Sequence, residues 1–103
     1  PEESGNRHAF HLYTVLVDQK RCGVSRDEFL ERMTSQGIGV GVHYLSIPEH
    51  PFDRERVGWT PSEYPVATKS GREIVSLPLS AQLTSEDVAD VVQAVRRVLS
   101  VPA

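Results

Sequence analysis

The chain has 103 residues, of which 39% are hydrophobic and 24% charged, and its net charge of −3 gives an isoelectric point near 5.8. This length suits one domain, residues 1–103, with a modest core. The acidic balance argues against a nucleic-acid-binding protein, which needs a basic face. No apolar run is long enough to cross a membrane. The single cysteine, Cys22, excludes an internal disulfide and fits a reducing, cytoplasmic setting.

The chain begins with a polar segment that leads into a predicted strand. Residues 1–7 have neither an initiator methionine nor a signal peptide, so we expect a processed chain or one cut from a longer polypeptide. Residues 8–17 are rich in aromatic and β-branched side chains, which favour a strand. From Leu12 this segment is apolar on both sides except at Thr14, which predicts a strand covered on both faces. Residues 18–24 are expected to form a turn.

A first helix is predicted over residues 25–36. Ser25 and Glu28 have the spacing of a capping box, in which each side chain accepts a hydrogen bond from the other residue's backbone N–H. Gly37 follows the helix and is a natural left-handed stop.

The stretch that organises the sequence is residues 37–51, where a glycine-rich strand is expected to lead into an irregular loop. Strand side chains alternate, so Gly39, Gly41 and His43 share one face that has almost no bulk before His43. The strand should therefore deliver His43 and Tyr44 to the mouth of a loop, where binding groups are common. A phosphate-binding loop is not favoured, because such loops follow a strand and open a helix.

The rest of the chain predicts a loop, a short helix, a strand and a final helix. Residues 45–61, with three prolines, are expected to form a long loop of functional importance. Pro65 can open a short helix to Arg72, because its missing N–H costs nothing there. Residues 74–79 predict a short strand. Thr84 caps a final helix with valines at helical spacing, whose burial should contribute on the order of 10 kcal/mol before entropy is subtracted.

The element order predicts an α/β fold of the two-layer α+β kind. The order is strand, helix, strand, loop with a short helix, strand, helix, and no internal repeat is present. We expect a small three-stranded sheet, mostly antiparallel or mixed, with two main helices and one short helix packed on it.

The four histidines do not have the spacing of a metal site. His8 and His11 are three residues apart on a predicted strand, so they point to opposite faces. His43 and His50 can converge, but no carboxylate or thiolate lies at ligand spacing from them. A small metal-binding protein is therefore an alternative that requires metal uptake dependent on His43 and His50.

No complete catalytic centre is visible in the sequence. Lys20 and Lys69 lie in polar segments, whereas a Schiff-base lysine needs a desolvated pocket. The candidate binding residues are His43, Tyr44 and His50, because their loop combines aromatic surface with hydrogen-bond donors. The alternative is that His43 and Tyr44 only anchor the loop.

Several short motifs, taken in order, resemble one enzyme family. They are His11-Leu12-Tyr13, Arg26 with Phe29-Leu30, Gly37-Ile38-Gly39-Val40, Val42-His43-Tyr44, Pro48, His50-Pro51, Pro65-Val66-Ala67, Ser76-Leu77-Pro78-Leu79 and Leu83-Thr84. Their order and gaps over residues 8–99 resemble the C-terminal domain of the DegT/DnrJ/StrS sugar aminotransferases. The sequence departs from this pattern at residues 45–47, where relatives often have a proline directly after His-Tyr.

The resemblance implies the small C-terminal domain of a fold-type I, pyridoxal-phosphate-dependent aminotransferase that acts on a nucleotide-linked keto sugar. In such enzymes the cofactor lysine belongs to the larger N-terminal domain, so this chain is expected to hold no cofactor and no catalytic residue. The implied partners are that missing domain, a nucleotide sugar and, in the parent enzyme, a second copy in a homodimer. By position, the resemblance places His43 and Tyr44, and less directly His50, near the active-site mouth.

A second hypothesis is a free-standing α/β, ferredoxin-like binding or interaction module without a catalytic parent. The predicted strand-helix-strand start is compatible with it. The surface separates the two hypotheses, because a domain cut from a larger enzyme should expose an apolar docking patch that a natural monomer would cover.

Overall fold

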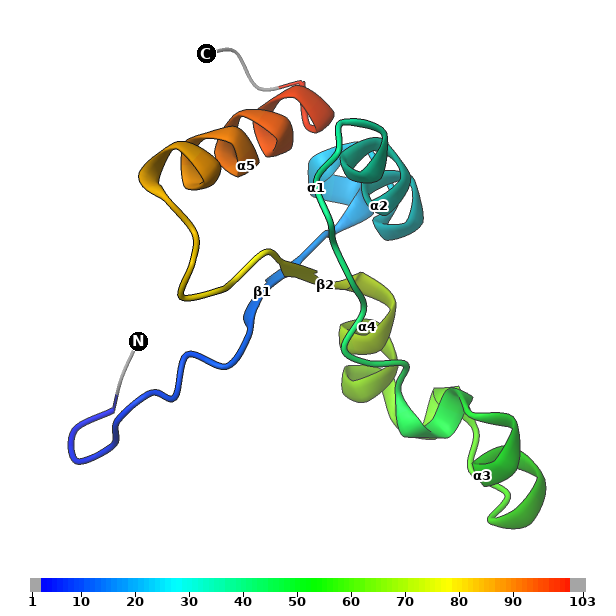
Figure 1. Ribbon diagram of the computed structural model, residues 1–103. Helices are drawn as coiled ribbons and strands as arrows, with labels where there is room; N and C mark the ends of the chain where they lie inside the picture. The colour runs from blue at the N-terminus through cyan, green and yellow to red at the C-terminus, as the bar shows by residue number, and fades with distance from the viewer. Residues whose placement is uncertain (1–2, 101–103) are drawn as a thin grey trace.

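The computed structural model describes residues 3–100, which form two short strands and a series of helices (Figure 1). The elements in chain order are β1 (Tyr13–Leu16), α1 (Gln19–Cys22), α2 (Arg26–Ser35), the 3-10 helix η1 (Ile47–Glu49), α3 (Pro51–Arg56), the 3-10 helix η2 (Pro61–Glu63), α4 (Pro65–Glu73), β2 (Ile74–Leu77) and α5 (Ser85–Val98). No helix within residues 3–100 combines the length and the apolar character needed to cross a membrane.

The sheet consists of β1 and β2 in antiparallel pairing, with Tyr13 opposite Leu77 and Leu16 opposite Ile74. The prediction of a third strand was wrong, because its segment contributes only a single bridge. There the N–H of Gly41 donates to the carbonyl of Ser76 at 3.1 Å, and the N–H of Ser76 donates back at 2.8 Å. Glycines weaken a strand because they lose more entropy on ordering and offer no side chain to pack.

The N-terminal strand is shorter than predicted. Only residues 13–16 of the predicted 8–17 are paired, because β2 is itself four residues long. Residues 3–11 are exposed along their whole length. The prediction that this strand is covered on both faces was also wrong, since Tyr13 and Leu16 are exposed on opposite sides of it.

The predicted helix signals are confirmed. The Ser25 hydroxyl accepts a hydrogen bond from the Glu28 N–H at 3.2 Å, and the Ser25 N–H donates to the Glu28 carboxylate at 2.9 Å. Gly37 is left-handed, with φ at 77°. Thr84 and Asp87 form a second capping box at the start of α5. The predicted turn at residues 18–24 contains the four-residue helix α1, which was not foreseen.

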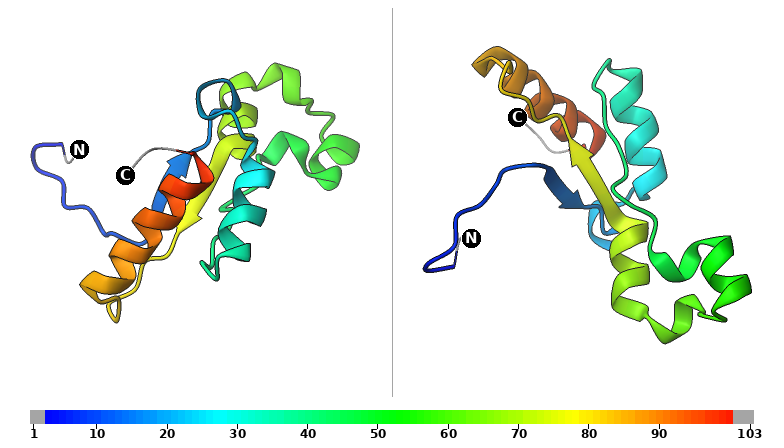
Figure 2. Two further views of the ribbon diagram at one scale, coloured as in Figure 1. Left: turned by 90° about the horizontal axis from the view of Figure 1, so that it is seen from above. Right: turned by 60° about the horizontal axis from the view of Figure 1, so that its bottom comes forward.

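The core is small and lies between α2, α5 and one face of the sheet. Its buried residues are Val17, Val24, Phe29, Met33, Val75, Ala94 and Val98. Figure 2 shows α2 and α5 side by side, and α2 packs against both α5 and β2. The prediction that the valines of α5 are buried holds only at its C-terminal end, because Val88 and Val92 are 50% and 44% exposed.

The long loop predicted over residues 45–61 is instead a chain of short helices. With α4 these helices form an arm, residues 45–73, that projects away from α2 and α5 (Figures 1 and 2). Each of its four helices has a proline in its first turn, where the fixed φ suits a helix and the missing N–H costs nothing. The prediction assigned Pro48, Pro51 and Pro61 to a loop, which was wrong. The prediction that Pro65 opens a short helix is confirmed by α4.

The chain is extended for its length. Its radius of gyration is 16.0 Å, whereas a compact domain of this size has about 13 Å. Its accessible surface is 7909 Å², whereas a compact monomer of 11.5 kDa exposes about 5,800 Å². The chain therefore leaves uncovered a surface that a self-contained domain would bury.

Candidate functional site

The candidate site is built on the face of the sheet that the helices of the core do not cover. Val75 is fully buried against the core, so its neighbour Ser76 points to the opposite face. On that face the Ser76 hydroxyl lies 2.8 Å from Nδ1 of His43. Backbone hydrogen bonds of Ser76 also hold Gly41, two residues before His43. β2 thus fixes both the segment and the side chain of His43.

Gly41 makes room for the His43 ring. A Cβ atom added at Gly41 would lie 3.2 Å from Cε1 of His43, which is tighter than ordinary contact. Gly39, on the same predicted face, has no such neighbour, because a Cβ added there would meet nothing within 4 Å. The missing side chain therefore matters only at Gly41, where it leaves space for the imidazole ring of His43.

Tyr44 extends the site outward from His43. The two rings are 4.8 Å apart and nearly perpendicular, at 84°, which is a favourable edge-to-face geometry. Tyr44 is 73% exposed, and neither residue lies beneath α5. His43 is held and partly covered, while Tyr44 presents an aromatic face to whatever approaches the sheet.

His50 lies apart, at the start of α3. Its Nε2 atom is 3.3 Å from the carbonyl oxygen of Leu45, so it braces the turn after Tyr44. No group of three or more His, Cys, Asp or Glu side chains within residues 3–100 is arranged to hold a metal ion. The structure therefore gives no support to the metal-binding alternative for His43 and His50.

A half-buried carboxylate that sequence reasoning missed, that of Glu49, holds the arm near this site. Glu49 accepts hydrogen bonds from the Ser46 hydroxyl and from Nε of Arg72, each at 2.9 Å. Burial alone would raise the pKa of Glu49, but the hydrogen bonds from Ser46 and Arg72 and the charges of Arg72 and Arg26 outweigh it and lower the pKa. Glu49 thus ties η1 to α4 as a charged group.

Two further contacts fix the base of the arm, one inside it and one to α2. A Cβ at Gly71 would lie 2.7 Å from the backbone nitrogen of Ser46, so α4 and the loop after Tyr44 touch at a glycine. Arg26 donates from Nη1 to the carbonyls of Gly71 and Ile74 at 3.1 and 3.3 Å. A cation in the first turn of a helix opposes the helix dipole, and this unfavourable position was the sequence signal that Arg26 has another role.

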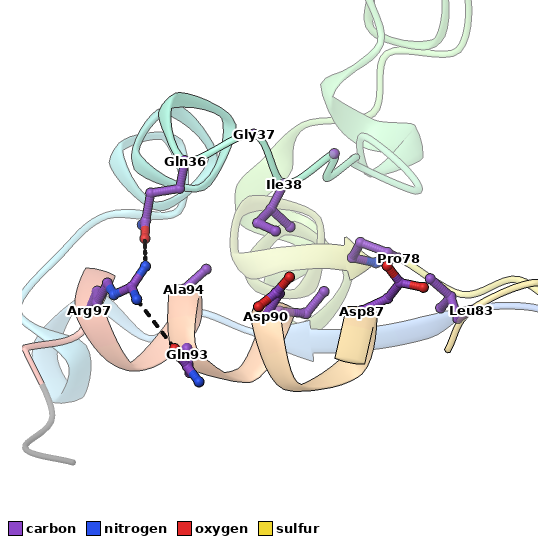
Figure 3. Close-up of a pocket in the computed structure, with 12 residues that line it drawn as sticks. Gln36, Gly37, Ile38, Pro78, Leu83, Asp87, Asp90, Gln93, Ala94 and Arg97 are labelled. Atoms are coloured by element: carbon purple, nitrogen blue, oxygen red, sulfur yellow. Dashed lines mark hydrogen bonds between the residues drawn. The ribbon is translucent and has the colours of Figure 1, made fainter. Parts of the chain in front are cut away.

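The clearest cavities lie elsewhere on the described chain. A cleft of about 390 Å³ separates the end of α2 from α5 (Figure 3). It is bridged by Arg97, which donates to side-chain oxygens of Gln36 and Gln93 at 3.5 and 3.2 Å. An apolar groove lies on the other side of α5. His43 and Tyr44 line neither of these two cavities, and Tyr44 is exposed on the surface of this chain.

The two lysines are not placed for covalent chemistry. Lys20 is exposed on α1. Lys69 is exposed on α4, with its amine 4.0 Å from a carboxylate oxygen of Glu73. A Schiff-base lysine lies in a desolvated pocket, whereas both of these side chains are exposed. The residues of this chain therefore do not fit the lysine site that pyridoxal phosphate requires.

Comparison with known proteins places these features in a family context. The sequence profile of the DegT/DnrJ/EryC1/StrS aminotransferase family matches residues 1–96. Protein MJ1066 of Methanocaldococcus jannaschii is 36% identical over 94 residues, and the spore coat polysaccharide biosynthesis protein SpsC of Bacillus subtilis is 35% identical over 94 residues. These matches cover 91% and 90% of this chain but only 24% of each relative.

A solved structure agrees with the sequence matches. The putative sugar aminotransferase Spr1654 of Streptococcus pneumoniae, in its PMP form, superposes with a TM-score of 0.74 at 26% identity. The superposition covers 87% of this chain and 22% of that protein. The chain thus spans about a quarter of the length of the proteins that it matches.

Proposed function

The chain belongs to the DegT/DnrJ/EryC1/StrS aminotransferase family, and from this premise we propose that it is the small C-terminal domain of a pyridoxal-phosphate-dependent sugar aminotransferase. In this proposal the rest of the polypeptide provides the cofactor site and the catalytic lysine. The cofactor, held there, supplies the electron sink for amino-group transfer. The chain alone is not catalytically competent.

The placement of the two lysines supports a division of labour between this chain and the rest of the enzyme. Lys20 and Lys69 are both exposed, so neither lysine lies in a desolvated pocket. The matched relatives are about four times as long as this chain, which leaves room for a cofactor-binding domain. A missing N-terminal domain is therefore the first partner in the proposal.

His43 and Tyr44 are proposed to contact a nucleotide-linked keto sugar, and His50 to support them from the start of α3. The single observation that carries this role is the hydrogen bond between Nδ1 of His43 and the Ser76 hydroxyl, which orients a polar ring beside the exposed ring of Tyr44. An oriented imidazole can bond a hydroxyl or a phosphate, and an aromatic face can cover a sugar or base. These side chains bind and orient the substrate and perform no chemical step.

The surface of the chain favours this proposal over a free-standing module. The large uncovered area and the exposed apolar residues of α5 are what a domain removed from a larger enzyme should display. We extend the proposal to a homodimeric parent in the cytoplasm, a setting that the single free cysteine fits.

Steady-state kinetics of the parent enzyme test the role of His43. We expect His43→Ala to raise KM for the nucleotide sugar and to leave KM for the amino donor nearly unchanged, because only the sugar is bound at this face. The matched control is His8→Ala, whose ring contacts its neighbour Phe10 in the segment before β1. Unchanged sugar kinetics for a folded His43→Ala enzyme would remove His43 from the site.

A further inference from the structure

An apolar groove beside α5 leaves hydrophobic surface of the chain uncovered. It encloses about 520 Å³ and is lined mainly by Tyr13, Val15, Leu77, Leu79, Val88 and Val92. Arg96 is its only charged lining residue. Within residues 3–100, Arg96 has neither an ion pair nor a side-chain hydrogen bond. We refer to this surface as the α5 groove.

The α5 groove marks a gap in the helical layer of the fold. α2 packs on β2 and on α5, and α5 turns Ala94 and Val98 toward the same core as Val75 of β2. On the same face of the sheet, Tyr13 and Val15 of β1 line the groove. A two-layer fold buries the apolar face of its sheet under helices, so the position over β1 is where a further helix belongs.

The uncovered surface of the whole chain, of which the α5 groove is one part, is large enough for an extensive contact. The accessible surface of 7909 Å² exceeds that of a compact monomer by roughly 2,000 Å², whereas each partner in a standard interface buries about 800 Å². Obligate interfaces are both larger and more apolar than transient ones, which matches the lining of the groove.

The path of the chain indicates where the occupant comes from. The segment before β1 is exposed throughout residues 3–11 and reaches the sheet at Tyr13, which lies on the wall of the groove. All views in Figures 1 and 2 show this segment on the side where α5 begins, away from the arm. A preceding segment tethered here would be present at a high effective concentration.

We propose that the α5 groove holds an amphipathic helix from the part of the same polypeptide that precedes Pro1. Its apolar face packs on Val88 and Val92, and one carboxylate on its rim pairs with Arg96. This inference rests on the proposed function, because it names the surface by which this chain joins the rest of the enzyme. It concerns a contact remote from His43.

Hydrogen exchange read by mass spectrometry tests this contact. The samples are this 103-residue chain and the longer protein that its own reading frame encodes upstream of Pro1. In the longer protein, we expect peptides from residues 85–95 to exchange at roughly one tenth of the rate in the 103-residue chain, or more slowly still. The reason is that a packed helix suppresses local opening. Equal exchange in the two samples would overturn the proposal.

Matched variants of the longer protein give a second readout. Val92→Glu places a carboxylate in the filled groove and is expected to restore fast exchange in α5. Ala89→Glu adds the same group on the exposed side of α5, outside the groove, and should leave exchange unchanged. Arg96→Glu should act like Val92→Glu, because it sets two carboxylates against each other. Identical behaviour of Val92→Glu and Ala89→Glu would contradict the assignment.

Two further outcomes separate this inference from its alternatives. If the 103-residue chain sediments as a dimer and protects residues 85–95 as it does so, a second copy fills the groove and the proposal is wrong. If His43→Ala leaves the kinetics of the parent unchanged while the exchange pattern is as expected, the substrate role fails and the α5 groove assignment stands.

Discussion

The core and the arm of this chain are stabilised in different ways. The core buries apolar side chains from α2, α5 and β2 around Phe29 and Met33. The arm has only Pro48, Thr68 and Gly71 buried among its helical residues, and it is held by polar contacts at its base. Burial of apolar side chains is non-directional and is the main source of folding free energy. A few hydrogen bonds can position a segment but add little net stability. The candidate site lies where the two regions meet.

The largest expected difference between the regions is in the cost of removing a hydrophobic side chain. Met33→Ala should lower the free energy of unfolding by about 2–5 kcal/mol, because Met33 is fully buried and leaves a cavity. Phe52→Ala in α3 should change it by about 0.5 kcal/mol or less, because Phe52 is 67% exposed. Urea unfolding followed by circular dichroism measures both. Equal losses would show that the arm has a core of its own.

A smaller effect is expected at the base of the arm, where α4 touches the segment after Tyr44. Gly71→Ala should cost about 1–3 kcal/mol, because the new methyl group would push the backbone of Ser46 away from α4. It should also speed hydrogen exchange in residues 45–57. Gly39→Ala is the control, since a Cβ there meets open space. Gly-to-Ala changes in helices that meet no neighbour stabilise the chain. If Gly71→Ala does the same, the close contact between Gly71 and Ser46 is unimportant.

The bond that orients His43 is expected to contribute less. Ser76→Ala should cost about 0.5–1.5 kcal/mol and should release the His43 ring, because Nδ1 loses its hydroxyl partner. Nitrogen NMR of the imidazole is expected to show a changed tautomer balance, and Ser76→Thr should preserve the native one. Thr14→Val, opposite Ser76 on β1, is the control. An unchanged His43 spectrum in Ser76→Ala would remove this hydrogen bond from the account.

The smallest effect is the acid sensitivity of the arm. Because the folded state lowers the pKa of Glu49 below its ordinary value of 4.5, Glu49 stabilises the fold above that pH. This stabilisation is lost as the pH falls through the lowered pKa. Protection factors in residues 45–57, which correct for the pH dependence of the intrinsic exchange rate, should therefore fall more steeply in acid for the native chain than for Glu49→Gln. Parallel pH profiles would contradict the role of Glu49.

Local signals in the sequence predicted the elements that depend on local chemistry. The start of α2 is set by the capping box of Ser25 and Glu28, and its end by Gly37. The start of α5 is set by the Thr84 cap. The third strand failed because pairing depends on a partner elsewhere, and glycines weaken it further. The short helices of the arm were missed because each is little more than one turn around a proline.

The site was predicted only in part, for a similar reason. His43 and Tyr44 were singled out from their loop and from the resemblance. Ser76, which holds His43, lies 33 residues further along the chain, and Glu49 meets Arg72 across 23 residues. Such pairs have no fixed spacing, so no local pattern reveals them. The sequence of this chain also cannot reveal the residues that complete the site beside Tyr44, because in our proposal they belong to another part of the enzyme.

The central claim is that this chain shapes a site whose reactive group lies elsewhere in the polypeptide. The most direct test mixes the isolated chain with pyridoxal phosphate, reduces the mixture with borohydride and maps the labelled lysines by mass spectrometry. The account predicts weak, non-saturating labelling of Lys20 and Lys69 alike, and no amino-group transfer. Saturable one-to-one labelling of a single lysine, accompanied by transfer activity, would contradict it.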